Sequence, residues 1–563
     1  MKTNVQALPS TSTSSQGILR LIGGLVLLAP AAFIGLGGLA WPTLATFILS
    51  LQKTSLSSAG QFVGAQNYSL ILGDKTFGAA LSYTLGLVIV RLLVVAIVPV
   101  LLALAVSRFG RGVRWPVRLL FTVPIAMFAP AATGAVWLES VSSGLGLFKD
   151  TSWLSSPDRA RLALTFIDGL YVYGLACAAG TVVYLAALRR SEGSAAPSRR
   201  PLILAWITSL LAVIALTLQS FALSFVLTGG GPANSTTTLA LYQYKVVFQF
   251  LRFGAGAAAA TITLAALSVL GLVAGLIVVL AGLKLELAPW RQLQEPSQPR
   301  RNAGTIVLLV VVLLVSVAVG VAGTWPALAN ILVSFQRDQA YTKAFQTLPL
   351  ATAFANTLVP ALIVVLLQVP VAYLAALGIG AVRPLGRWSE VLLLPISPWL
   401  FVTAVPLSIV AFQNLQKMHA LNTLAGLVPP LPLSVPMVFA LTLFFKGQMS
   451  HWQNARLGGQ SAAAATWGQL IWPSLPLVIL LASVALLVSL QDLYWPLLVS
   501  NTPAGMPFSV ALIRQMHLTP DWPLVAASIT TFELPLFLWF FVIFGLLQCL
   551  YLDRLILTGG KPK

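Results

Sequence analysis

The chain has 563 residues, of which 58% are hydrophobic and only 8% are charged. A soluble globular protein carries about 25% charged residues, so this composition excludes an ordinary soluble enzyme and a disordered chain. The long apolar blocks also exclude an outer-membrane β-barrel, whose strands alternate over about 10 residues. The composition therefore predicts an all-α polytopic membrane protein.

Twelve apolar blocks, taken in chain order, are long enough to cross a hydrocarbon core of about 30 Å as helices. In the first half they lie at residues 18–50, 78–106, 117–138, 161–188, 201–227 and 255–283. In the second half they lie at 304–333, 351–381, 389–412, 424–445, 473–499 and 523–551. The first block exceeds the apolar core of about 7–15 residues in a cleavable signal, so we expect a retained helix.

The segment 284–302, between blocks six and seven, is rich in proline, glutamine and charge, and we expect a cytoplasmic linker there. Six spans on either side return the chain to the same face, so the halves 1–283 and 303–563 are predicted to be parallel. A weak internal repeat favours a duplication. At a spacing of 271 positions, Pro232–Ala233 recurs as Pro503–Ala504, and Ala240–Leu241 recurs as Ala511–Leu512.

The net charge of +19 follows the predicted topology. With the N-terminus inside, the inside segments hold 21 of the 33 Lys and Arg residues and the outside loops hold 11. This excess predicts that both termini are cytoplasmic in a multi-pass protein of the cytoplasmic membrane. Because the loops account for the basic charge, we do not expect a nucleic-acid partner.

One outside loop reads TGGGPANST over residues 228–236. By itself this is a tight turn, because glycine permits positive φ and Asn, Ser and Thr satisfy loop backbone groups. The loop closely resembles the one after the fifth core helix in the larger permease subunit of maltose-type carbohydrate ABC importers. The loop residues that carry this resemblance are Gly229, Gly230, Gly231, Pro232 and Asn234.

Other segments resemble the same permeases in the same order. FVGAQNYSLIL at 62–72 resembles their FVGLxNY segment, and Thr84 fits an Asn-Thr pair although Tyr83 replaces the Asn. In the second half, Asn356–Thr357 supplies that pair, and Leu421-Asn422-Thr423 fits an outer turn of the smaller subunit. QDLYWPLLVSN at 491–501 resembles a further segment of the smaller subunit. The resemblance implies one chain that fuses both permease subunits.

In such permeases a cytoplasmic EAA loop docks as a short helix in a groove of the ATPase. TWGQLIWPSLPL at 466–477 resembles the end of this loop, with Leu475–Pro476 just before the next helix. The candidate docking residues are Leu457, Gly458, Gly459, Ala462, Ala463, Trp467, Leu475 and Pro476. The acids of the usual EAAxxDGA pattern are missing here. The first half has only about a dozen residues in which to form its own loop, between Leu188 and Leu202.

A sugar is held by flat aromatic faces and planar hydrogen-bonding groups. The candidate residues of the substrate path are Tyr171, Tyr173, Gln219, Phe221, Gln491, Asp492, Tyr494 and Trp495. An interfacial aromatic belt is the alternative explanation for those at span ends. Charges within spans are costly and rare. Arg91 and Asp168 could pair across the bundle, while Glu533 lies before a proline in the last span.

Catalytic patterns are not found in the sequence. His419, His451 and His517 fall in different loops without the spacing of a metal site, and no GxxxxGK[ST] phosphate loop occurs. Cys177 and Cys549 both lie in apolar blocks, as buried small hydrophobic residues do. We therefore expect no enzyme activity, no metal and no cofactor in this chain, with ATP bound by partner subunits.

The resemblance implies a carbohydrate importer that works by alternating access. Its expected partners are a cytoplasmic ABC ATPase dimer, an extracytoplasmic solute-binding protein, the lipid bilayer and a carbohydrate substrate. An ion-coupled secondary transporter is the alternative, in which Arg91, Asp168 and Glu533 would couple to ions. An enzyme acting on lipid-linked sugars would need an acidic cluster in a large loop, which the sequence lacks, and a non-transporting paralogue is a further alternative.

Overall fold

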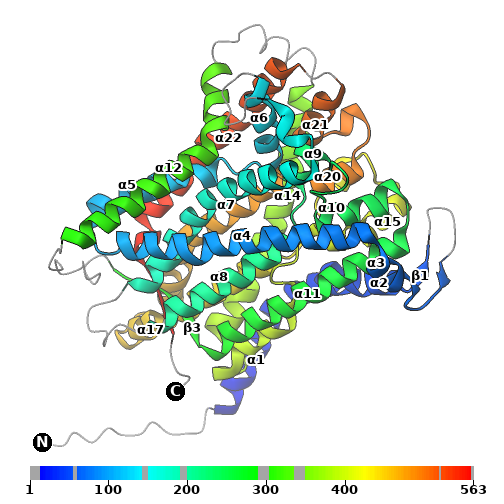
Figure 1. Cartoon of the computed structure of the whole chain (residues 1–563). Helices are drawn as coiled ribbons and strands as arrows, with labels where there is room; N and C mark the ends of the chain where they lie inside the picture. Colours follow the sequence, from blue (N-terminus) through cyan, green and yellow to red (C-terminus); the bar gives the residue numbers. More distant parts are fainter. Residues whose placement is uncertain are drawn as a thin grey trace, which may run out of the picture.

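The structure is a computed structural model that describes residues 13–54, 60–142, 150–189, 199–289, 303–334, 349–518 and 521–559. Long helices cross the molecule side by side, and the described strands are short (Figure 1). Segments marked η are 3₁₀- or π-helical.

The first half contains α1 (Thr13–Gly35), η1 (Leu36–Ala40), α2 (Trp41–Ser50), β1 (Gln52–Lys53), β2 (Gln61–Phe62), α3 (Gln66–Gly73), α4 (Lys75–Val106), α5 (Arg111–Ala126), α6 (Pro130–Ser142), η2 (Thr151–Leu154), α7 (Pro157–Leu188), α8 (Arg200–Leu218), α9 (Ala222–Thr228), α10 (Leu239–Tyr244), η3 (Lys245–Gln249), α11 (Phe253–Leu280) and β3 (Leu283–Leu287).

The second half contains α12 (Ala303–Ser334), α14 (Leu350–Leu377), η5 (Gly378–Val382), η6 (Gly386–Trp399), α15 (Ala404–Lys417), α16 (Leu424–Leu427), α17 (Val435–Leu457), α18 (Ala462–Thr466), η7 (Trp467–Ile471), α19 (Trp472–Leu490), α20 (Tyr494–Val499), η8 (Pro503–Gly505), α21 (Phe508–Leu518), α22 (Trp522–Leu550), η9 (Leu552–Arg554) and β4 (Leu555–Gly559).

Local sequence signals explain where the long helices begin. The side chain of Asp74 accepts the N–H of Thr76 at 2.8 Å and so caps α4. Ser156 caps α7, and Pro157 occupies the first helical position, where a missing N–H costs nothing. Within the helices, runs of Leu, Val and Ala leave one face for packing and another for lipid. Leu85, Ile89 and Leu93, four residues apart on α4, are between 46% and 59% exposed.

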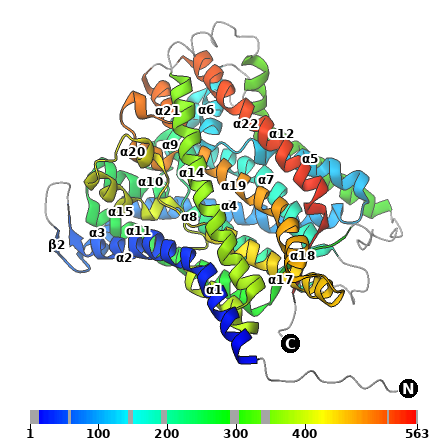
Figure 2. The same cartoon turned by 180° about the vertical axis from the view of Figure 1, so that it is seen from behind.

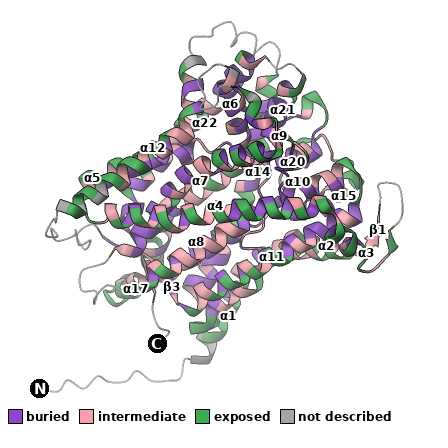
Figure 3. Cartoon of the chain, in the orientation of Figure 1, coloured by how far each residue is buried: buried purple, intermediate pink, exposed green. Residues whose placement is uncertain are grey.

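The outer surfaces of the long helices keep many exposed residues, as Figure 3 shows along α1, α4 and α11. Within the described residues, nine helices are long and apolar enough to cross a membrane. Two bent pairs bring the number to eleven if each pair is one span, with bends of 88° between α5 and α6 and 73° between η6 and α15. The predicted all-α, multi-pass class is therefore confirmed.

The block predicted at 424–445 is the one that differs from these spans. Pro429, Pro430 and Pro432 limit the helix at its start to the short α16, and α17 begins only at Val435 and continues to Leu457. The second part of this helix is polar, and α17 is not among the candidate spans, so the described residues give nine to eleven spans instead of twelve.

The order of elements recurs along the chain at a nearly constant spacing. Helices α8 and α19 begin at residues 200 and 472 and end at 218 and 490, so both ends lie 272 positions apart. Helices α9 and α20 begin at 222 and 494, and strands β3 and β4 begin at 283 and 555, again 272 positions apart. A gene duplication produces this kind of regularity, in which equivalent helices keep equivalent lengths.

The two strands that end the two halves pair with each other. Strands β3 and β4 form an antiparallel sheet in which Leu285 lies opposite Leu557. Residues 284–287, the start of the predicted linker, therefore form a strand, and residues 290–302 of that linker lie outside the described residues. The sheet lies beside α17, on the side of the molecule away from α9, α20 and α21 (Figure 1). Figure 2, seen from behind, shows α14 running next to α19 in the second half.

Candidate functional site

Gln219, the residue that follows α8, connects the two halves at the break between η6 and α15. Its Nε2 donates to the carbonyl oxygens of Ala215 and Phe401, both at 2.9 Å. Its Oε1 accepts the N–H of Thr403 at 2.7 Å and the Thr403 hydroxyl at 2.8 Å. All the hydrogen-bonding capacity of the amide is used, so this predicted path residue holds the broken helix of the second half in place.

Gln491 follows α19 in the position that Gln219 has after α8, but it has a different partner. Its Nε2 donates to the Glu533 carboxylate on α22 at 2.8 Å. The contact stays inside the second half, whereas that of Gln219 crosses between halves. The two breaks are therefore held by different interactions, although the helices that carry them recur.

Tyr171 on α7 faces the first break, between α5 and α6. Its ring stacks on that of Phe128 with 6.1 Å between the ring centres, and it lines a pocket with Pro124 and Met127. Tyr173, two residues later, lies on another face of the helix and donates its hydroxyl to Ser316 of α12 at 3.2 Å. The structure thus brings Tyr171, but not Tyr173, to the break.

The two charged residues inside the first half form an ion pair with each other. Nε and Nη2 of Arg91 on α4 donate to the two carboxylate oxygens of Asp168 on α7 at 2.7 and 2.5 Å, which confirms the predicted pairing. Nη1 of Arg91 donates to the hydroxyl of Thr217 at 3.3 Å. This two-pronged geometry ties α4, α7 and α8 together and neutralises both charges.

An aromatic cluster joins the halves near the start of α9 and α20. The rings of Phe221 and Tyr494 are perpendicular, with 4.8 Å between their centres. Tyr244 adds an edge contact to Phe221 at 5.4 Å. The Tyr494 hydroxyl lies 3.1 Å from that of Ser408 and 3.5 Å from the amide nitrogen of Gln243. Phe221 and Tyr494, both predicted path residues, therefore pack against each other.

The other two predicted residues of this region support α20. The Asp492 carboxylate accepts the N–H of Tyr494, the first residue of the helix, at 3.0 Å. The Trp495 indole N–H donates to the carbonyl oxygen of Gly426 at 3.0 Å, and its side chain is buried. These contacts position the helix.

The TGGGPANST loop is a compact turn fixed to α7. Gly229 and Gly230 have φ angles of +57° and +89°, and a Cβ on Gly230 would lie 2.4 Å from the hydroxyl of Thr237. Asn234 Oδ1 accepts a hydrogen bond from Lys245 at 3.1 Å. The Gly231–Pro232 bond is cis. The loop geometry therefore needs its glycines, as the sequence analysis predicts for such a turn.

Thr84 and Thr357, singled out by the family pattern, occupy matching positions on α4 and α14. Each hydroxyl accepts the backbone N–H of the first residue of an outer helix, Leu239 on α10 and Phe508 on α21. The sequence analysis did not single out Gln243 and Thr403, which complete the contacts between halves. Their partners lie far away in the sequence, so no local pattern marks them.

Several known proteins are similar to this chain, while no family model matches it. A probable ABC transporter permease protein of Sinorhizobium fredii is 30% identical over 256 residues, which are 80% of that relative and 40% of this chain. The chain belongs to the ABC transporter permease family. It is a membrane-spanning permease component, and the predicted family resemblance is confirmed.

Two further relatives of this permease show the same proportions. The sulfoquinovosyl glycerol transport system permease protein of Agrobacterium fabrum is 27% identical over 85% of its length and 43% of this chain. The trehalose transport system permease protein of Mycobacterium tuberculosis is 25% identical over 86% of its length and 44% of this chain. Matches of about two-fifths are consistent with two permease lengths joined in one chain.

The predicted docking loop of the permease forms a short exposed helix, α18. Ser461 caps it by accepting the N–H of Ala464 at 3.2 Å, and Ala462 and Ala463 on it are exposed. Next to it, Leu457 and Trp467 are 87% and 59% exposed. The glycines before α18, Gly458 and Gly459, allow a sharp turn, with φ of +90° at Gly459.

The end of that loop differs from the sequence expectation. Leu475–Pro476 lie inside α19 instead of before it, because the π-helical segment η7 joins α18 to α19 without a loop. Such a π-helical turn accommodates a nearby proline whose missing N–H would interrupt an α-helix. The loop of the first half, residues 190–198, lies outside the described residues.

Proposed function

We propose that this permease forms both halves of the translocation path of a carbohydrate importer, with residues 1–283 like the larger subunit and 303–563 like the smaller. The observation that carries the proposal is the recurrence of equivalent elements 272 positions apart within one chain that is twice the length of its relatives' matches. Relatives named for sulfoquinovosyl glycerol, multiple sugar and trehalose transport favour a carbohydrate substrate.

The path itself favours an uncharged solute. Arg91 and Asp168 neutralise each other, and the amide of Gln219 is fully hydrogen-bonded at the break between η6 and α15. Tyr171, which lines the pocket at the other break, then offers an aromatic face to a sugar ring. In alternating access, movement at the two breaks and opening of the Phe221–Tyr494 contact would expose this pocket to each side in turn.

The expected partners supply what the chain lacks. Both termini and the arginine-rich loops would face the cytoplasm, where a separate ABC ATPase dimer binds and hydrolyses ATP. The exposed Leu457 and Trp467 beside α18 support docking through apolar contacts, since the acids of the usual loop are missing. A solute-binding protein would deliver sugar to the outer loops, including Gly229–Asn234.

The decisive experiment is a pull-down of the detergent-solubilised permease against the ABC ATPases of its organism. Co-purification, with ATP hydrolysis stimulated by the sugar-loaded binding protein, is the expected result. Uptake into proteoliposomes should then require ATP and be indifferent to a proton or sodium gradient. Uptake that follows an ion gradient without any ATPase would contradict the proposal.

A further inference from the structure

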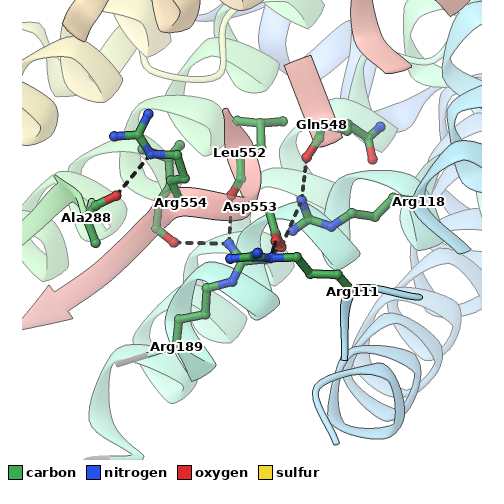
Figure 4. A network of polar contacts seen from close by, with 9 residues as sticks. Arg111, Arg118, Arg189, Ala288, Gln548, Leu552, Asp553 and Arg554 are labelled. Carbon is green, nitrogen blue, oxygen red and sulfur yellow. Dashed lines mark hydrogen bonds and ion pairs between the residues drawn. The ribbon is translucent and has the colours of Figure 1, made fainter. Parts of the chain in front are cut away.

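Arginine side chains gather around one buried carboxylate where the last helix of the permease ends. Asp553 lies in η9, just after α22 (Figure 4). Its carboxylate is 2.5 Å from Nη2 of Arg189, 3.7 Å from Nη1 of Arg118 and 3.9 Å from Nε of Arg111. Arg189 follows α7, whereas Arg111 and Arg118 lie on α5, so the cluster joins both halves of the chain.

The cluster carries more positive than negative charge. The side chains of Asp553 and Arg118 are 1% and 0% exposed, and that of Arg189 is 8% exposed. Burial lowers the pKa of Arg189, and the nearby charges of Arg118 and Arg114 lower it further. One carboxylate neutralises one guanidinium, so the remaining buried charge is costly without another anion.

Several donors of the cluster are also left without acceptors in the part of the chain that the structure describes. Nη1 of Arg118 donates to the carbonyl oxygen of Gln548 at 2.8 Å, but its Nε and Nη2 are buried and make no hydrogen bond. Arg114 lies on α5 between Arg111 and Arg118, and its Nε atom and that of Arg189 are also buried without a hydrogen bond. A guanidinium presents its donors as a planar fork that matches two oxygens of a phosphate group.

The position of the cluster suits a group at the membrane surface. It lies at the start of α5 and at the ends of α7 and α22, all of which we predict to face the cytoplasm. Leu119 and Leu120, at the next turn of α5, are 37% and 39% exposed, as lipid-facing residues are. The Arg111 side chain is 38% exposed, so the cluster can be reached from the surface of the molecule. Basic pockets between helices at this depth bind anionic lipid head groups.

We propose that Arg111, Arg114, Arg118 and Arg189, here called the basic cluster, form a binding site for a phosphate group beside Asp553. The group comes from an acidic phospholipid or from free phosphate. It supplies the second negative charge that the buried guanidinium groups require. Because the site joins α5 and α7 to the tail of α22, its occupant strengthens the contact between the two halves. The proposal does not depend on the transported substrate.

The test compares the full-length chain with Arg114→Gln, which removes one cluster charge, and Arg387→Gln, which removes an exposed arginine elsewhere. In one arm, the protein in detergent is titrated with inorganic phosphate against chloride at equal ionic strength, and the midpoint of thermal unfolding is recorded. In the other arm, nanodiscs of phosphatidylcholine with or without phosphatidylglycerol are analysed by native mass spectrometry.

Retention of one phosphatidylglycerol per chain would identify the occupant as a lipid head group. Stabilisation by inorganic phosphate would identify it as free phosphate. In either case Arg114→Gln should weaken binding about tenfold, because one charge-assisted bond is lost, while Arg387→Gln should bind like the unaltered chain. Equal responses of the unaltered chain and Arg114→Gln in both arms would overturn the proposal.

A second variant tests the proposal if Arg114→Gln does not fold. Asp553→Asn removes the carboxylate that competes for the same guanidinium groups. A phosphate site then gains affinity by about threefold or more, because a repelling charge is gone. A purely structural ion cluster would instead lose stability equally in phosphate and in chloride, which is the contrary result.

Discussion

Thr84 and Thr357 make the same hydrogen bond in the two halves of the permease. The Thr84 hydroxyl accepts the N–H of Leu239 at 3.0 Å, and the Thr357 hydroxyl accepts the N–H of Phe508 at 2.9 Å. Each N–H opens a helix, where backbone donors have no partner inside the helix itself. Both threonines also donate to carbonyl oxygens of their own helices, those of Ala80 and Ala353. Both halves therefore use the same hydrogen bond to join a long helix to an outer helix.

We expect Thr84→Val and Thr357→Val to destabilise the permease by similar amounts. Valine keeps the shape but leaves a buried N–H without an acceptor, which costs about 1–3 kcal/mol. The midpoint of thermal unfolding in detergent measures the loss. Thr84→Ser and Thr357→Ser keep the hydroxyl and serve as matched controls that should lose less. A loss confined to one half would show that the two junctions are not equivalent.

Removing one partner of the Arg91–Asp168 pair should be worse than removing both. Arg91→Leu or Asp168→Leu leaves an uncompensated buried charge, which costs about 3–5 kcal/mol, whereas the double variant leaves none. Unfolding of the three variants forms a double-mutant cycle. We also expect the double variant to keep ATP-dependent uptake. Complete loss of uptake in a stable double variant would show that the pair takes part in transport.

Gln219→Leu should release the break between η6 and α15. The N–H and hydroxyl of Thr403 lose their acceptor, and we expect a loss of about 1–3 kcal/mol together with reduced uptake. Gln219→Glu keeps the acceptor oxygens, so its stability and uptake should lie between those of the unaltered chain and those of Gln219→Leu. Gln491→Leu, which changes the equivalent position but not a contact between halves, is the comparison. Identical behaviour of Gln219→Leu and Gln491→Leu would refute the assigned difference.

The strand pair predicts a specific cross-link. Leu285 and Leu557 lie directly opposite, and Cα atoms of opposite residues in an antiparallel pair are about 4.5–5.5 Å apart, within the range of a disulfide. A Leu285→Cys/Leu557→Cys variant with a protease site inside 290–302 should stay in one piece on a non-reducing gel after cleavage. Leu285→Cys alone should separate into two halves.

The docking loop gives a further prediction. Leu457→Asp and Trp467→Ala should each lower co-purification of the ATPase about tenfold, because burial of a large apolar side chain contributes about 1.5–3 kcal/mol. Met418→Asp, on an exposed side chain that we predict to face outside, is the matched control. Unchanged ATPase binding by both loop variants would show that the ATPase docks elsewhere.

The sequence predicts the helices better than it predicts their contacts. If each bent pair is counted as one span, long apolar runs give eleven of the twelve spans within the described residues, because hydrophobic length is a local property. The twelfth differs because three prolines inside its apolar run, among them Pro430, delay the helix to Val435. The Arg91–Asp168 pair is predictable, since each charge inside the membrane needs the other.

The contacts of Gln219 and the surroundings of Asp553 are not predictable in this way. Gln219 meets Phe401 and Thr403, which lie 182 and 184 positions away, and an amide can bond to almost any backbone group. Asp553 looks like an ordinary acid in a basic tail until the fold brings Arg118 and Arg189 to it. Pairing in space is needed before either residue acquires a role.

The strand pair marks the line that relates the two halves to each other. Any rotation that exchanges the halves must carry β3 onto β4, and because these strands are antiparallel it is a half-turn about a line between Leu285 and Leu557. The sheet lies on that line, whereas α9 and α20 lie on the other side of the molecule (Figure 1). Each half therefore meets its own counterpart in this sheet, because Leu285 and Leu557, which lie opposite each other, are 272 positions apart.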